Sequence, residues 1–165
     1  MERLNKDVYF MLLARVVALR STCIRRAVGC ILVDGDSRIV STGYNGGLPA
    51  EPHCIDTPCL GAEDPAGDTS RCKAIHAEVN AIHQAGSAAK AVEWAYVTAT
   101  PCFQCARHMV LTLPRLCGVF SIEMYTEPVE SGYMVLKDRG IKVELLGGVG
   151  SMSIDKLFAQ MERFR

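Results

Sequence analysis

Two short stretches decide how this sequence is interpreted: "AIHAEVNAI" at residues 74–82 and "TPCFQC" at residues 100–105. The first places His76 two residues before Glu78, and the second is a Cys-x-x-Cys pattern that follows a proline. A proline before Cys-x-x-Cys is typical of the start of a helix, where free backbone N–H groups and the helix dipole favour thiolates. The two stretches therefore predict two helix starts that carry metal-ligating side chains.

The predicted metal site has three ligands, His76, Cys102 and Cys105. Three protein ligands leave the fourth position of a tetrahedral zinc open, which is typical of a catalytic site rather than a structural one. Zinc lowers the pKa of a bound water to about 7, and such a site needs a further group that moves protons. We expect Glu78 to be that group. The alternative is a structural zinc knuckle with an incidental glutamate, but a closed structural site needs a fourth ligand nearby.

Helix geometry restricts where the histidine and the glutamate can sit. Residues i and i+2 of an ideal helix point about 200° apart, so His76 and Glu78 cannot face one site from the middle of a helix. We therefore predict that the helix over 76–86 begins at this motif, with His76 at the cap or in the first turn.

Length and composition predict one globular domain over residues 1–165. No apolar run approaches the ~18 residues of a membrane span, and charged residues interrupt the N-terminal apolar stretch, which predicts a cytosolic domain. The 18 basic and 18 acidic residues balance, which disfavours a long nucleic-acid partner. Eight cysteines without an export signal indicate metal binding rather than disulfides.

The pattern of apolar residues predicts a mixed sheet. A helix over 7–20 is followed by a hairpin with strands at 28–33 and 38–43, and residues 44–75 are irregular. After that, helices and strands alternate, which is typical of crossover connections between parallel strands. The expected helices are 76–86, 102–112, 129–139 and 153–164, and the expected strands are 93–100, 116–124 and 141–146. The expected fold class is α/β, a three-layer α/β/α sandwich with a mixed central sheet of about five strands.

The His-Ala-Glu and Pro-Cys-x-x-Cys motifs together resemble the zinc-dependent nucleoside and nucleotide deaminases. The resemblance implies that His76, Cys102 and Cys105 hold the catalytic zinc. It also implies that a metal-bound hydroxide attacks the ring carbon that carries the amino group. Glu78 then shuttles protons without binding zinc.

Three further stretches narrow the resemblance: "TGYNG" at 42–46, "STCIRRAVG" at 21–29 and the continuation of the histidine motif as "HAEVNAI". From about residue 8 to residue 127 the chain resembles the deoxycytidylate (dCMP) deaminases of phages and bacteria, within the cytidine deaminase superfamily. This resemblance implies a hydrolase that converts dCMP and water to dUMP and ammonia in pyrimidine deoxynucleotide biosynthesis. It implies a cytoplasmic enzyme, in the host cytoplasm if it is phage-encoded.

The resemblance also suggests substrate contacts. Asn45 is a candidate for a sugar or phosphate contact, although "YNGG" would also suit a tight turn. Ser21, Arg25 and Arg26 are candidates for the 5′-phosphate, although a solvated basic pair would look the same. Tyr125 corresponds to a tyrosine that closes over the nucleotide, or is a packed strand-end aromatic.

For the pyrimidine base, the resemblance implies contacts from the backbone. The Ala77 N–H would reach the pyrimidine O2, and the Thr100 carbonyl would receive the amino group.

Six cysteines remain after the predicted catalytic ligands are removed. Cys30 and Cys117 sit in apolar, strand-like runs and are expected to be small buried hydrophobes. Four others suggest a closed four-thiolate zinc site, because most of them lie in a segment with little hydrophobicity of its own: Cys23, Cys54, Cys59 and Cys72. Phage and bacterial dCMP deaminases often carry such a second zinc, with the first ligand at the position of Cys23. His53 could replace one thiolate, and four unbound thiols are the alternative.

Other functions remain open at the level of sequence. A dCTP or modified-dCMP deaminase would use the same centre, and a tRNA adenosine deaminase would prefer a basic surface, which this neutral chain lacks. A zinc-stabilised binding module would have no use for Glu78. The resemblance implies a homohexamer without membrane association. It further implies allosteric control, with dCTP as positive and dTTP as negative effector and Mg²⁺ bound with the nucleotide triphosphate.

Overall fold

The computed structural model describes residues 3–62, 71–124 and 132–147. Within them lies a five-stranded mixed sheet with the strand order β2-β1-β3-β4-β5. β1 pairs antiparallel with β2 and with β3, whereas β3, β4 and β5 run parallel. The elements in chain order are α1 (Lys6–Ala18), β1 (Gly29–Asp34), β2 (Ile39–Tyr44), α2 (Ala77–Ala85), the 3₁₀-helix η1 (Gly86–Ala91), β3 (Val92–Ala99), α3 (Phe103–Thr112), β4 (Gly118–Glu123), α4 (Gly132–Asp138) and β5 (Lys142–Leu145).

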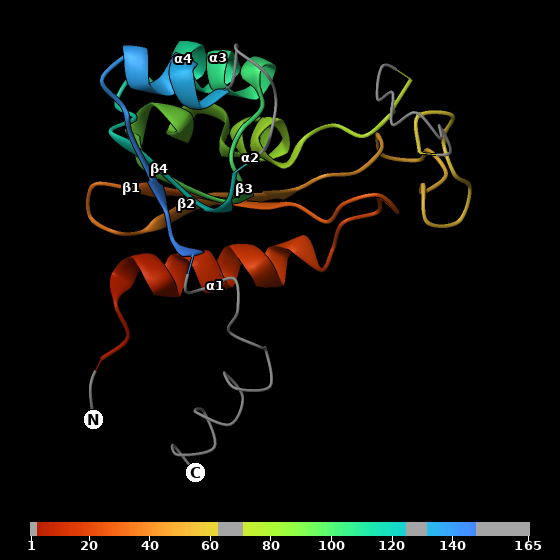
Figure 1. Cartoon of the computed structure of the whole chain (residues 1–165), viewed down its shortest axis with the longest axis horizontal. Coiled ribbons are helices and arrows are strands. Elements are labelled where there is room, and N and C mark those ends of the chain that lie inside the picture. The colour runs from red at the N-terminus through yellow and green to blue at the C-terminus, as the bar shows by residue number, and fades with distance from the viewer. Residues whose placement is uncertain (1–2, 63–70, 125–131, 148–165) are drawn as a thin grey trace.

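Helices cover both faces of the sheet (Figure 1). Of the helices in the described residues, α1 covers one face, where Phe10, Tyr96 and Phe120 belong to one buried cluster. α2, α3 and α4 cover the other face, where the larger buried cluster includes Ala81, Met109 and many others. The predicted three-layer α/β/α sandwich is therefore confirmed, and the predicted strand and helix types are confirmed for the described elements.

Some predicted boundaries differ from the structure. α4 ends at Asp138, and Gly140 follows with a φ of 71°, a conformation that glycine adopts at little cost. η1 was not predicted; it begins at Gly86, the C-cap of α2, which has a φ of 52°. The helix expected over 153–164 and the first residues of the one expected over 129–139 lie outside the described residues.

The segment between β2 and α2 leaves the sheet and returns to it as a projecting lobe (Figure 1). Its base is closed by a bridge in which Gly46 and Ile75 exchange two backbone hydrogen bonds of 3.1 and 2.8 Å. The lobe therefore starts and ends at one place, beside the beginning of α2. In the described part of the chain, no helix is long and apolar enough to cross a membrane.

Candidate metal centre and active site

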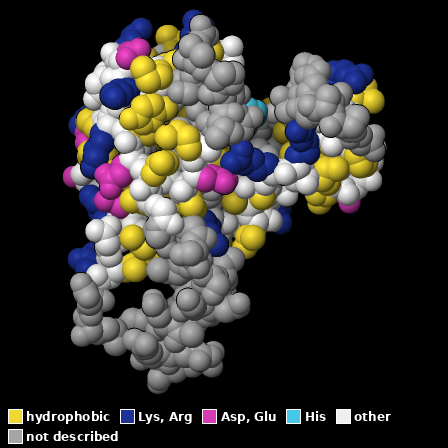
Figure 2. All heavy atoms as spheres, viewed as in Figure 1, with side chains coloured by type: hydrophobic (Ala, Val, Ile, Leu, Met, Phe, Trp, Pro, Cys, Tyr) yellow, Lys and Arg dark blue, Asp and Glu magenta, His cyan; other side chains and the backbone are white. Residues whose placement is uncertain are grey.

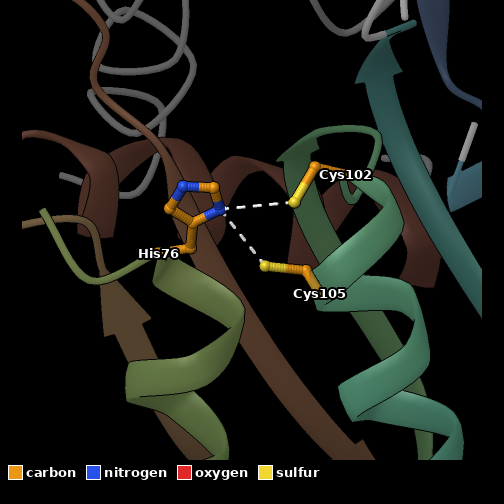
Figure 3. A group of neighbouring side chains, drawn as sticks. All are labelled: His76, Cys102 and Cys105. Atoms are coloured by element: carbon orange, nitrogen blue, oxygen red, sulfur yellow. Dashed lines mark hydrogen bonds between the residues drawn. The ribbon is translucent and has the colours of Figure 1, made fainter. Parts of the chain in front are cut away.

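His76, Cys102 and Cys105 converge on one point, as the sequence predicted (Figure 3). The Nδ1 atom of His76 lies 3.2 Å from the Cys105 sulfur and 3.5 Å from the Cys102 sulfur. All three ligand atoms lie within 4.8 Å of one another. A tetrahedral zinc with Zn–S bonds of about 2.3 Å and a Zn–N bond of about 2.0 Å needs ligand atoms that are roughly 3–4 Å apart, so this donor set fits zinc.

Both ligand motifs lie at helix starts. His76 is the N-cap of α2, in extended conformation (φ −70°, ψ 152°), and Cys102 is the N-cap of α3 (φ −67°, ψ 168°). Neither N-cap side chain makes a capping hydrogen bond to the first turn of its helix. The prediction that His76 lies at the cap or in the first turn of its helix is confirmed. Two helix N-termini, each with partial positive charge, therefore face the same site and favour thiolates there.

A hydrogen bond joins the two cysteines of the centre. A hydrogen bond from Cys105, assisted by one from His76, lowers the pKa of Cys102 to about 4. The same hydrogen bond to Cys102, together with burial, raises the pKa of Cys105. Without a metal, Cys102 is therefore the thiolate of the pair and Cys105 the thiol.

Glu78 is the buried acid of the site. Only 4% of the residue is exposed, and this burial raises the pKa of its carboxyl, despite the opposing effect of a backbone hydrogen bond and of His76. α2 holds this residue rigidly, because Ser41 donates to the Ala81 carbonyl (2.7 Å) and Asn80 donates to the Tyr44 carbonyl (2.8 Å). The arrangement is a buried carboxyl fixed beside a three-ligand metal site.

A cavity of about 430 Å³ opens beside the metal centre. This volume lies in the range of pockets that take small molecules. Basic side chains lie on both sides of the hollow between the lobe and the body of the molecule (Figure 2). Most predicted site residues line the cavity, and the full lining is Cys23, Arg25, Arg26, Val28, Asn45, Cys72, Ala74, His76, Ala77, Glu78, Ala99, Thr100 and Cys102.

Asn45 fixes the loop between α1 and β1. Its Oδ1 accepts from the Val28 N–H (2.8 Å) and from the Ser21 hydroxyl (2.7 Å), and its Nδ2 donates to the Arg26 carbonyl (2.8 Å). An amide has two acceptor positions and two N–H donors, so a single N–H is left for a ligand. Ser21 does not line the cavity; its hydroxyl lies behind Asn45 and also accepts from the Cys23 N–H (3.2 Å).

The two arginines are attached to different parts of the molecule. Arg25 donates to the Gly61 carbonyl in the lobe (2.7 Å), whereas Arg26 pairs with Glu123 at the end of β4 (2.7 Å). Glu123 also fixes Thr100, because its carbonyl accepts from the Thr100 N–H (3.0 Å) and hydroxyl (2.8 Å). Sequence reasoning missed Glu123, although its place at the carboxyl end of a parallel strand is where sites form in such sheets. Tyr125 lies outside the described residues.

The four further cysteines approach one another without forming a compact ligand set. The sulfurs of Cys54 and Cys59 are 3.8 Å apart, and all four residues are half-buried. The Cys72 thiol is hydrogen-bonded to the Cys59 thiol and interacts electrostatically with Cys23. Burial raises the pKa of the Cys72 thiol. Among the described residues, the metal centre at His76 is the one group of three or more ligand atoms that all lie within 4.8 Å. The Nδ1 atom of His53 lies 3.8 Å from a carboxylate oxygen of Asp56, and both side chains are exposed.

Outside these groups, one cysteine prediction is confirmed and one is wrong. Cys30 is fully buried in β1, as expected. Cys117 is exposed; it lies directly before β4, where its thiol donates to the Arg115 carbonyl (3.2 Å). A run of apolar residues in the sequence also includes residues just outside the strand, and the run does not indicate that these residues are exposed to solvent.

The sequence pattern of the cytidine and deoxycytidylate deaminase zinc-binding region matches residues 4–117. The chain is 33% identical over 137 residues to the deoxycytidylate deaminase of Mycobacterium phage D29, covering 79% of this chain and all of that protein. It is 40% identical over 112 residues to the ComE operon protein 2 of Bacillus subtilis and 36% identical over 141 residues to the deoxycytidylate deaminase of Saccharomyces cerevisiae. These matches cover 67% and 83% of this chain, but it spans only 56% and 43% of those two relatives.

A solved structure has the same fold. The dCMP deaminase from the cyanophage S-TIM5, in complex with dCMP and dUMP, superimposes with a TM-score of 0.69 at 24% identity, covering 88% of this chain and all of that one. The cytidine deaminase-like fold expected from the sequence is thus confirmed. The matched region contains His76, Glu78, Cys102 and Cys105, the residues that the geometry brings together. The chain belongs to the cytidine and deoxycytidylate deaminase family.

Proposed function

We propose that this protein hydrolyses dCMP to dUMP and ammonia. The observation that carries the proposal is the buried carboxyl of Glu78, held beside a three-ligand metal site in a cavity that two arginines also line. Relatives named deoxycytidylate deaminase in a phage and a yeast support dCMP as the substrate. In the reaction, the bond from the ring carbon to the amino nitrogen breaks and a bond from that carbon to the water oxygen forms. One proton of the water leaves with the nitrogen as ammonia, and the other ends on the ring nitrogen N3.

His76, Cys102 and Cys105 would hold the zinc, since their ligand atoms fit it and Cys102 is already a thiolate. Zinc bound there supplies a water of lowered pKa, about 7. The two helix N-termini add positive charge around the same point, which stabilises negative charge during the reaction.

Glu78 would move the protons. Burial raises the pKa of its carboxyl, so Glu78 holds a proton at a higher pH than an exposed glutamate. A carboxyl with a pKa closer to the working pH both accepts a proton and returns it efficiently. Its position in the first turn of α2, two residues after a proposed ligand, supports this role.

The cavity walls would orient the nucleotide. The Ala77 N–H belongs to the first turn of α2, where N–H groups have no partner within the helix, and would donate to the pyrimidine O2. The Thr100 carbonyl would accept from the amino group, on a residue that Glu123 fixes. Asn45 would donate its one remaining N–H to the sugar, and Arg25 and Arg26 would bind the 5′-phosphate. For Ser21, we propose that it orients Asn45 rather than touching the phosphate.

The four further cysteines would hold a second, structural zinc. Cys23, Cys54 and Cys59 line a small cavity of about 100 Å³, and Cys72 is linked to Cys59. Few of the described lobe residues are buried, so a bound metal would be the simplest way to hold the lobe in one conformation. We include, on the resemblance alone, one catalytic domain over the whole chain, Tyr125 as a nucleotide contact, a homohexamer, dCTP and dTTP as effectors with Mg²⁺, and a cytoplasmic location.

Ammonia release tests the proposal directly. Purified protein is assayed with dCMP, dCTP, cytidine and deoxyadenosine nucleotides at equal concentration. We expect the highest kcat/KM for dCMP, because the cavity offers two arginines for the phosphate. Preference for a deoxyadenosine nucleotide, or no release from any of these compounds by zinc-loaded protein, would overturn the proposal.

A further inference from the structure

We infer that Gly132, the first residue of α4, is a positioning residue for the zinc ligand Cys102. An ideal Cβ built on Gly132 would lie 2.0 Å from the Pro101 carbonyl oxygen and 2.7 Å from the Cys102 carbonyl oxygen. Both atoms belong to the turn that presents the ligand at the start of α3. α4 and α3 lie side by side over the sheet (Figure 1), so α4 rests directly on this turn. The inference rests on the zinc site proposed above.

The collision would be with backbone, which cannot rotate away as a side chain could. Real Cβ atoms essentially never approach closer than 3.0 Å, so an alanine at this position requires a displacement of about 1 Å. Zinc ligation tolerates only about 0.2 Å in a ligand distance. A displacement of this size is therefore several times larger than the metal centre accepts.

Neither partner can yield easily. α4 is anchored by Leu136, which is fully buried, and its end is tied to the Ile141 N–H (3.0 Å). The turn is anchored by the fully buried Pro101 and by the two hydrogen bonds of Thr100 to Glu123. The same turn carries the Thr100 carbonyl and the Cys102 sulfur, so its displacement changes the proposed base contact and the metal ligand together.

A matched control exists on the opposite face of the sheet. Gly29 meets α1 as closely as Gly132 meets the ligand turn, since an ideal Cβ would lie 2.0 Å from the Ala14 carbonyl oxygen. α1 carries no ligand of the metal centre. Gly29→Ala therefore creates a similar collision in a part of the molecule that does not hold the metal.

The experiment measures zinc affinity of the full chain by competition with a chromophoric chelator, and records the visible bands of the Co²⁺-substituted protein. For Gly132→Ala we expect zinc affinity to fall about 10- to 100-fold, as for other residues that orient a ligand, and the cobalt bands to shift. Gly29→Ala should lose stability in urea but keep the affinity and the cobalt spectrum of the wild type. Unchanged affinity in Gly132→Ala, or an equal fall in Gly29→Ala, would overturn the inference.

A second pair of variants keeps the test valid if Gly132→Ala does not fold. Leu136→Ala removes the anchor of α4, and Leu113→Ala makes the same truncation in the same core at the far end of α3. We expect about a tenfold loss of zinc affinity for the first and none for the second; equal affinities would overturn the inference. These readouts need no substrate. A wild type that binds no zinc at His76 would instead contradict the proposed function.

Discussion

Two groups of metal-ligating side chains differ in how the fold holds them. The metal centre (His76, Cys102 and Cys105) takes its ligands from the starts of two helices that pack in the core, and its histidine nitrogen lies 3.2 and 3.5 Å from the two sulfurs. The four-cysteine group (Cys23, Cys54, Cys59 and Cys72) lies in loops, and the sulfurs of Cys54 and Cys59 are 3.8 Å apart. The metal centre is shaped by hydrophobic packing, whereas the four-cysteine group would gain its final shape from a metal.

This difference predicts opposite consequences of metal loss. Helices α2 and α3 bury apolar residues against the sheet whether or not zinc is bound, so losing the catalytic metal leaves the fold in place. Most of the described lobe residues are exposed, so the free energy of the proposed metal binding there would be largely free energy of folding.

The largest effects come from removing one ligand in each group. Cys102→Ser should abolish turnover and lower the zinc content by one, yet leave the urea midpoint and protease resistance nearly unchanged. Cys59→Ser should also lower the zinc content by one, from two per chain, but should expose the lobe to protease and lower the free energy of unfolding. Metal analysis and limited proteolysis followed by mass spectrometry check both variants. One zinc per chain in the wild type would remove the second site.

Within the metal centre, Glu78→Gln separates proton transfer from metal binding. The amide cannot exchange protons, so kcat for dCMP should fall by at least about 10³-fold. Zinc content and the unfolding midpoint should stay at wild-type values, since the amide is isosteric and is not a ligand. Turnover near the wild-type rate would show that Glu78 does not carry the protons.

The two arginines that would bind the substrate phosphate are attached to the two regions compared above. Arg25 is attached to the lobe and Arg26 to the sheet. Each charge-assisted hydrogen bond to phosphate is worth about 1.5–3 kcal/mol, so Arg25→Ala or Arg26→Ala should cost roughly 10- to 150-fold in kcat/KM for dCMP. The poor kcat/KM for deoxycytidine should barely change. Arg38→Ala, at an exposed arginine in the β1–β2 turn, is the control and should affect neither. Equal loss on both substrates would mean that the arginines are structural.

The smallest effect is a difference in thiol reactivity in the metal-free protein. Because the pKa of Cys102 is about 4, its thiolate fraction stays constant at higher pH, and its alkylation rate should be nearly flat from about pH 5 to pH 8. Burial raises the pKa of Cys72, so its thiolate fraction and alkylation rate should rise roughly tenfold per pH unit over that range. Peptide mass spectrometry after timed reaction with iodoacetamide gives both rates. Parallel slopes would contradict the assigned thiolate.

The metal centre could be predicted from sequence because its information is local. A proline before Cys-x-x-Cys predicts a helix start. Residues two apart in an ideal helix point about 200° away from each other, so His76 and Glu78 also predict a helix start. The structure places His76 and Cys102 at N-caps. The alternation of strands and helices then predicted the layers of the fold, which bring these two helix starts together.

What could not be predicted depends on distances between segments that are far apart in the chain. The pairing of Arg26 with Glu123 spans 97 residues, and the contact of Gly132 with Pro101 depends on how closely two helices approach. Asn45 was predicted to contact the nucleotide or to form a turn, but its bonds to Ser21, Val28 and Arg26 arise from the path of a neighbouring loop. Such contacts leave no periodic signal in a single sequence.

The strand order has a consequence for how fast the chain folds. β1 and β2 form a hairpin with a short turn, and β3, β4 and β5 follow one another through single helices, so these pairings join residues that are close in sequence. The pairing of β1 with β3 is different, because it places Cys30 opposite Val97. In the sequence, β2, the lobe, α2 and η1 lie between these two residues. Chain entropy opposes the closing of such a long loop, and long-range pairings slow folding. We therefore expect the meeting of β1 with β3 to limit the refolding rate, and bound zinc that shortens the lobe to accelerate it.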